Sequence, residues 1–157
     1  MSYSITIRGL DTIQRALGVD ISPAMRTATK GIAGAIHDKL SPYPPATIAN
    51  SPSNPMDRWY KRLSGPRWRT KKGEIHGRDT SEQLIHSWAI EPVGTAGTKL
   101  GSSASYAPYV HAAEKQSSAM KRIGWKTDDW AIRQVVDSGK AKDIVLRALA
   151  HFLHLGR

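Results

Sequence analysis

Prolines are concentrated in one part of the chain. Five of the nine prolines fall within residues 41–57. Proline lacks a backbone N–H and fixes φ, so a stretch this rich in proline is incompatible with a helix or a central strand. The sequence therefore predicts an extended arm at 41–57. In a subunit that assembles, such an arm often reaches a neighbour, and the alternative is an ordinary long loop.

A helix is predicted on the N-terminal side of this arm. Ser22-Pro23 combines an N-cap residue with proline in the first helical turn, which is typical of a helix start. Apolar residues then recur at helical spacing as far as Leu40. We expect a long N-terminal helix here, after a short helical turn at 12–17 that Gly18 closes.

Helices are also predicted in the C-terminal part. Thr127 can cap a helix whose first turn holds two carboxylates, and this helix should run to about Val136. Residues 140–155 place their apolar side chains on one face, the pattern of an amphipathic helix. Short helical segments are expected at 83–86 and 106–113.

Several segments have the alternation or the turn residues of strands. They are 3–8, 59–63, a basic hairpin at 67–76 turning at Lys72-Gly73, a second hairpin of 88–93 and 98–103, and 119–126. The order of elements predicts an α+β fold with a mainly antiparallel sheet, on which the long N-terminal helix and the C-terminal helices pack. With 157 residues, we expect one domain with the arm 41–57 and the basic hairpin 58–78 attached.

Positive charge is concentrated in residues 58–78. This stretch holds eight Lys and Arg residues against Glu74 alone, within a chain of net charge +10. Dense positive charge attracts polyanions such as nucleic acids independently of their base sequence. A basic hairpin that is simply solvated is an equally ordinary interpretation. The residues expected to contact DNA or an acidic partner are Arg62, Arg67, Arg69, Lys71 and Lys72.

Trp and Tyr, five of each, greatly outnumber the single Phe. Both favour half-buried positions and subunit interfaces, although they can also close the chain's own core. We expect the interface between subunits to involve Pro44, Pro45, Trp59, Tyr106 and Tyr109.

The chemistry of a catalytic or cofactor site is not apparent in the sequence. There is no cysteine, and no arrangement of nucleophile, base and oxyanion donor can be recognised. His151 and His154 lie three positions apart but lack a third ligand, so we expect no metal and no cofactor. The N-terminus does not resemble a signal peptide, and no apolar run is long enough for a membrane span. The sequence therefore favours a protein that is not an enzyme and has no membrane partner.

Residues 77–88 and 106–111 carry a resemblance to a known family. The first reads Gly-Arg-Asp-Thr-Ser-Glu-Gln-Leu-Ile-His-Ser-Trp and the second Tyr-Ala-Pro-Tyr-Val-His, with a predicted hairpin between them. Together with Ile-Arg-Gly-Leu-Asp at 7–11 and Gly65-Pro66, these segments resemble the neck and tail-completion proteins of tailed phages, also described as head–tail joining or minor tail proteins. The chain differs from many members after Val110, where it reads His-Ala-Ala-Glu-Lys-Gln.

The resemblance implies a structural protein of the virion neck or tail, made in the host cytoplasm. It implies a homo-oligomeric ring of sixfold or twelvefold order that joins tail to head around the DNA channel. The implied partners are other copies of the chain, neighbouring neck, tail-terminator or tail-tube proteins, and genome DNA bound non-specifically. The alternatives are a free nucleic-acid-binding module that uses 58–78 with Trp59 and Trp68 as stacking platforms, and a small hydrolase, which the missing catalytic groups disfavour.

Overall fold

The computed structural model describes residues 2–5, 8–42, 44, 68–69, 75–76, 84 and 86–155. Its elements in chain order are β1 (Ser2–Ile5), α1 (Leu10–Leu17), α2 (Ser22–Leu40), β2 (Trp68–Arg69), β3 (Ile75–His76), β4 (Trp88–Val93), β5 (Gly97–Ser102), α4 (Ala107–His111), α5 (Ser118–Ile123), α6 (Asp128–Val136) and α7 (Lys140–Leu155).

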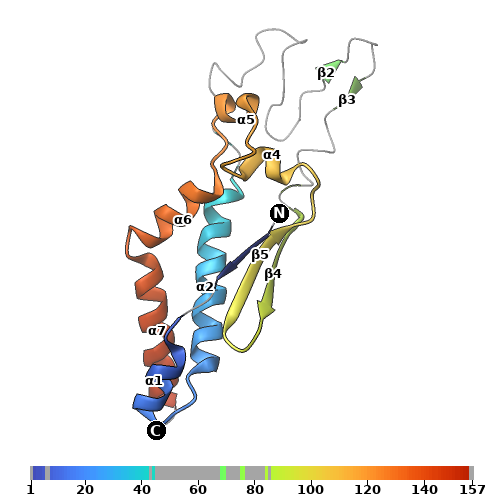
Figure 1. The fold of residues 1–157 in the computed structure, drawn as a ribbon. Helices are drawn as coiled ribbons and strands as arrows, with labels where there is room; N and C mark the ends of the chain where they lie inside the picture. Colours follow the sequence, from blue (N-terminus) through green and yellow to red (C-terminus); the bar gives the residue numbers. More distant parts are fainter. Residues whose placement is uncertain are drawn as a thin grey trace.

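Helix α2 is the centre of the fold. The sheet formed by β1, β5 and β4 lies along one side of α2, and α6 and α7 lie along the other (Figure 1). The largest core cluster joins all three layers, because Ile36 of α2 is grouped with Leu100 of β5 and Val135 of α6. Leu100 and Val135 are both fully buried. Burial of apolar surface on both sides of α2 is therefore the main source of stability.

The sheet has the strand order β1-β5-β4 and is antiparallel throughout. Successive residues of a strand point to opposite faces, and Thr98, Leu100 and Ser102 of β5 are the buried set. The outer face carries small and polar residues instead. There Ser4, Lys99 and Glu91 are neighbours across the three strands.

Close packing in two places fixes how α2 meets its neighbours. The Thr29 hydroxyl lies 2.8 Å from the hydroxyl of Thr98 and donates a hydrogen bond to the carbonyl of Ala96 at 3.1 Å or to the carbonyl of Arg26 at 3.1 Å. On the opposite side, a Cβ at Gly31 would lie 2.9 Å from Cγ2 of Ile144. The absence of a side chain at Gly31 thus lets α7 approach α2 closely.

A second core lies at the end of the molecule where α1 is found (Figure 1). Ile21, Ala24, Met25 and Ala96 are buried there, and Leu10, Leu149 and Phe152 pack around them. The short helix α1 therefore rests on the start of α2 and the last turns of α7.

Most of the predicted elements are confirmed. The fold is α+β with an antiparallel sheet, and the hairpin β4–β5, the capped helix α6 and the amphipathic helix α7 lie where the sequence placed them. The basic hairpin is confirmed at the backbone level, because Trp68 pairs with His76 and Arg69 with Ile75, a register centred on position 72.

Not every expectation holds. The first helix of the chain, α1, is not long, since it has eight residues, and the long helix expected at 22–40 is the second one, α2, with 19 residues. The segment 119–126 is not a strand, because the Ser117 side chain caps the helix α5 and Gly124, at φ 98°, ends it. The C-terminal helices lie mainly against α2, which stands between them and the hairpin β4–β5, while Tyr3 of β1 reaches Asp128 of α6 (Figure 1).

Other predicted segments fall outside the described residues. These are most of the arm 41–57, the strand at 59–63 and the helix start at 79–82. Of the arm, Ser41 closes α2 with a backbone hydrogen bond to His37, and Pro44 is buried. None of the helices in the described part of the chain is both long and apolar enough to cross a lipid bilayer.

Candidate interaction surface

Helix α4 contains the Tyr-Ala-Pro-Tyr-Val-His segment on which the family resemblance depends in part. Ala107 and Val110 are buried with Leu84 and Trp125, and Tyr106, the N-cap residue, packs against this cluster half-buried. Burial raises the pKa of Tyr106, and a backbone hydrogen bond from Leu84 opposes the shift.

One side chain of this segment, that of Tyr109, faces solvent. Tyr109 is 59% exposed, although the residues on either side of it pack inward. A large aromatic side chain in this position is available to a partner.

His111, the last residue of α4, is fully buried between two indole rings. Its ring centroid lies 5.6 Å from that of Trp88 and 5.3 Å from that of Trp125. Nδ1 lies 2.8 Å from the carbonyl oxygen of Lys126. Because a carbonyl only accepts, Nδ1 carries the proton, and Nε2 has no hydrogen-bond partner among the described residues.

Asp128 connects the start of α6 to two distant segments. Its Oδ1 accepts hydrogen bonds from the backbone of Ala113 at 3.0 Å and of Asp129 at 2.8 Å. Its Oδ2 accepts a hydrogen bond of 2.5 Å from the Tyr3 hydroxyl. Burial, followed by the contact with Asp128, raises the pKa of Tyr3 far above its usual range. Strand β1, the loop after α4 and helix α6 thus meet at one carboxylate.

Gln116 holds the loop between α4 and α5 in place. Its side-chain amide donates hydrogen bonds to the carbonyls of Val110 at 2.8 Å and Trp125 at 2.9 Å. With His111 and Asp128, it forms what we call the polar scaffold. The scaffold fixes the backbone from α4 to α6 beside the apolar cluster of Leu84, Ala107, Val110 and Trp125.

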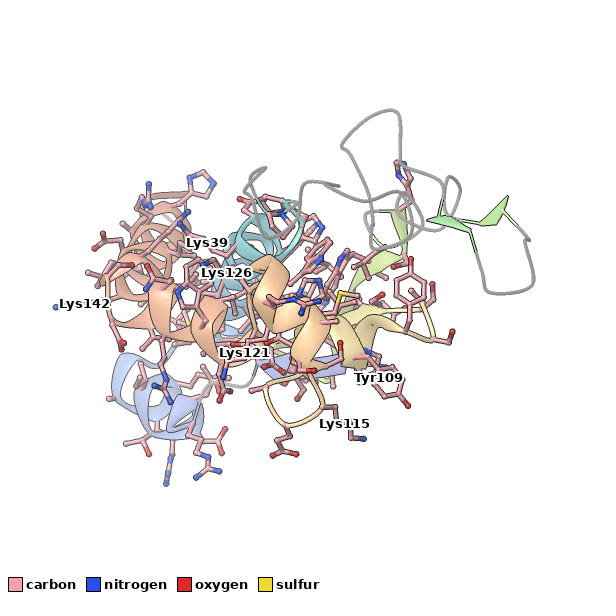
Figure 2. The ribbon with its side chains drawn as sticks, turned by 90° about the horizontal axis from the view of Figure 1, so that it is seen from above. Lys39, Tyr109, Lys115, Lys121, Lys126 and Lys142 are labelled. Carbon is pink, nitrogen blue, oxygen red and sulfur yellow. The ribbon has the colours of Figure 1, made fainter. Side chains whose placement is uncertain are left out.

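Four exposed cations lie in the segment that the polar scaffold holds in place. Lys115, Lys121, Arg122 and Lys126 are exposed, and Glu114 is the only acidic residue between positions 112 and 127. Figure 2 looks down on this end of the molecule, where Lys39 of α2 and Tyr109 of α4 are also seen. We call these six residues the end surface. Within the described part of the chain, none of its cations takes part in an ion pair.

Exposed apolar side chains are found elsewhere, on both sides of α2. Leu146 is 53% exposed and Leu153 is 43% exposed, and they lie two helical turns apart on the outer face of α7. On the sheet side, Ile90 and Val93 of the edge strand β4 are 37% and 42% exposed. They lie three positions apart, so they point to opposite faces of the sheet, and Val93 is on the outer face with Glu91. Exposed apolar side chains are thus found on α7 and on the outer face of β4, as well as at Ile13, Val19 and Val136.

Four of the residues predicted from the sequence lie in the described part of the chain, at different places in the fold. Tyr109 is exposed, Tyr106 is half-buried, and Pro44 is buried close to Gly124, which removes it from the accessible surface. Arg69 lies in β2. The other predicted residues, which are Pro45, Trp59, Arg62, Arg67, Lys71 and Lys72, lie outside the described part of the chain.

The sequence analysis did not predict the end surface. Residues 112–127 contain four cations and one carboxylate, but the positive charge of the stretch 58–78 is denser. Among the described residues, no group of three or more His, Asp or Glu side chains could hold a metal ion. An open hollow of about 320 Å³ on the outer face of the sheet is lined mainly by small and polar residues, among them Ser2, Ser87 and Gly101.

Comparison with known proteins does not add to this description. No protein-family model matches the chain, and neither the curated proteins nor the solved structures contain a match to it.

Burial of His111 has a measurable effect on stability. Its pKa is lowered chiefly by burial, while the hydrogen bond to Lys126 and the charge of Asp128 oppose the shift. As the pH falls through about 6.5, His111 therefore takes up a proton in the unfolded chain but not in the folded chain. The contribution of His111 to the free energy of unfolding should be constant above pH 6.5. At lower pH, the free energy of unfolding should decrease by up to about 1.4 kcal/mol per pH unit.

Urea unfolding between pH 7.5 and 5.5 tests this expectation. His111→Gln cannot titrate, so its stability should depend less on pH over the same interval. The control is His151→Gln, which changes an exposed histidine of α7. Identical pH profiles for the wild type and His111→Gln would contradict the assignment.

Proposed function

We propose that the chain is a structural subunit of a tailed-phage virion, and that it forms a ring in the neck or tail-completion region around the DNA channel. The resemblance of residues 77–88 and 106–111 to that family first suggested this role. The observation that supports it best is that exposed apolar side chains lie at two unlike places on opposite sides of α2, at Leu146 and Leu153 of α7 and at Val93 on the outer face of β4.

Two different surfaces suit a head-to-tail contact between copies. In such a contact, one surface of a subunit meets the other surface of the next, and a rotation that closes gives a ring. A twofold dimer would instead use the same surface on both partners. We assign the α7 surface around Leu146 and the β4 surface around Val93 to successive subunits of the ring.

The first test is made on virus particles. Deleting the gene from the genome that encodes it should leave separate filled heads and tails, seen by electron microscopy, and the chain should be found by mass spectrometry in wild-type particles. Joined, infectious particles that lack the chain would overturn the proposal.

The second test examines the interface. Leu146→Glu places a charge in the α7 surface and should prevent complementation of the deletion, because burying an unpaired carboxylate between subunits is costly. His151→Glu is the control, since it puts the same group on α7 away from Leu146 and Leu153. Both isolated variants should fold, as judged by circular dichroism. Complementation by both would contradict the assigned interface.

A further inference from the structure

The end surface differs in chemistry from the rest of the exposed molecule. Four cations of the segment 112–127 face solvent with Lys39, and Tyr109 of α4 is a large exposed aromatic side chain. In Figure 2 the labelled lysines spread across this end, and Tyr109 lies on the same side as Lys115. The surface thus combines several cations with one exposed aromatic ring.

The cations stand on a fixed backbone. Lys115 precedes Gln116, whose amide bridges two carbonyls, and Lys126 provides the carbonyl that binds His111. Lys126 also lies over the ring of Trp130, with Nζ 5.1 Å from the centroid. Lys121 and Arg122 lie in a helix that is capped at both ends. A ligand that binds here does not have to order this backbone, which reduces the entropic cost of binding.

The composition of the end surface favours a nucleic acid over an acidic protein as its partner. Protein–protein interfaces have an apolar centre and are depleted in lysine. Interfaces with nucleic acids are more polar and much more positive, and their contacts go largely to phosphates. The end surface has four lysines and one arginine, and among the side chains whose burial is described there, Tyr109 is the large exposed aromatic one, which can stack on an unpaired base.

We infer that the end surface binds the phosphate backbone of a nucleic acid independently of sequence, through Lys39, Lys115, Lys121, Arg122 and Lys126. This inference deepens the proposed function, because a subunit around a DNA channel would meet packaged DNA. It locates a DNA contact in α4 and α5, separate from the basic stretch 58–78. Binding of DNA by the isolated chain does not depend on ring formation, so the two proposals can fail separately.

The experiment measures binding of a fluorescein-labelled DNA duplex to the full chain by anisotropy at several salt concentrations. The triple variant Lys115→Gln, Lys121→Gln, Arg122→Gln removes three cations of the end surface. Each lost phosphate contact should reduce the slope of log Kd against log salt by about 0.9. We expect a reduction of about 2 to 3 in that slope and a Kd at least roughly tenfold higher near 0.1 M salt.

The matched control removes the same charge elsewhere. Lys30→Gln, Arg133→Gln, Lys142→Gln changes three exposed cations of α2, α6 and α7, and its slope should stay within about 1 of the wild type. Equal losses in the two triple variants would overturn the inference and indicate a response to net charge alone. Loss of binding only on replacing Arg67, Arg69, Lys71 and Lys72 would overturn it as well, while a DNA contact of the basic hairpin would stand.

Two further measurements separate the possible ligands. Polyglutamate should displace the duplex poorly, because its charge density and counterion release are lower, and displacement as effective as by DNA would overturn the choice of nucleic acid. Tyr109→Ala should weaken binding of a single-stranded oligonucleotide by roughly fivefold or more and leave duplex binding nearly unchanged. An equal effect on the duplex and the single strand would contradict the stacking role of Tyr109.

Discussion

Leu100→Ala is expected to lower the free energy of unfolding by about 2–5 kcal/mol. Leu100 is fully buried in β5, at the point where the sheet meets α2. Removing its isobutyl group loses the transfer free energy and leaves a cavity that two rigid layers cannot easily fill. Urea unfolding followed by circular dichroism measures the loss as a lower midpoint with an unchanged slope.

The matched control for this change is Leu146→Ala. Leu146 has the same side chain but is 53% exposed on α7, so its truncation should alter the stability of the isolated chain by about 0.5 kcal/mol or less. The difference between the two losses in free energy of unfolding distinguishes Leu100, which stabilises the fold, from Leu146, which we assign to assembly. Similar losses for the two variants would mean that the α7 surface is covered in the isolated protein.

Asp128→Asn should cost about 2–4 kcal/mol, although the two side chains have nearly the same shape. The carboxylate accepts three hydrogen bonds on two oxygens. An amide has one oxygen. If that oxygen keeps the two backbone donors, the NH2 group donates to the Tyr3 hydroxyl, which loses the acceptor for its own proton, and all three charge-assisted hydrogen bonds are weakened. The amide of Ala113 should also lose protection from hydrogen exchange, because the loop after α4 is no longer fixed.

Asp129→Asn is the control for the second prediction. Asp129 occupies the same first turn of α6 and is exposed, so its replacement removes a similar favourable interaction with the helix dipole, worth about 1 kcal/mol or less. If both variants lose the same amount, the charge at the helix start and not the three hydrogen bonds is the source of stability.

Local signals explain what the sequence could predict. Thr127 accepts a hydrogen bond from the backbone of Trp130, as its position before two carboxylates indicated. The hairpin β4–β5 has the strand boundaries expected from the turn residues between them, within one residue. In each case a few neighbouring residues determine the local conformation, so it can be predicted without knowing which distant segments pack against it.

The failure at residues 119–126 also has a local cause. A strand was expected at 119–126, but Ser117 and Gly124 provide capping at both ends of a helix. Six residues are too few for a helical period to be recognised, and the caps determine the outcome.

The polar scaffold could not be predicted at all. Tyr3 and Asp128 are 125 positions apart, and His111 meets a carbonyl oxygen, to which any residue type could contribute. Such contacts arise only once α2 has brought the sheet and the C-terminal helices to its two sides. The end surface depends on the same contacts, so the sequence alone does not show that its cations lie together.

The central place of α2 also determines when the core can close during synthesis. Helix α2 is synthesised before the groups that cover it, which come from β5, α6 and α7. Until these are made, its apolar sides are open to solvent and to other nascent chains. The core around α2 therefore closes only after translation of α7, and a truncated product that ends before residue 140 would be a substrate for chaperones and proteases.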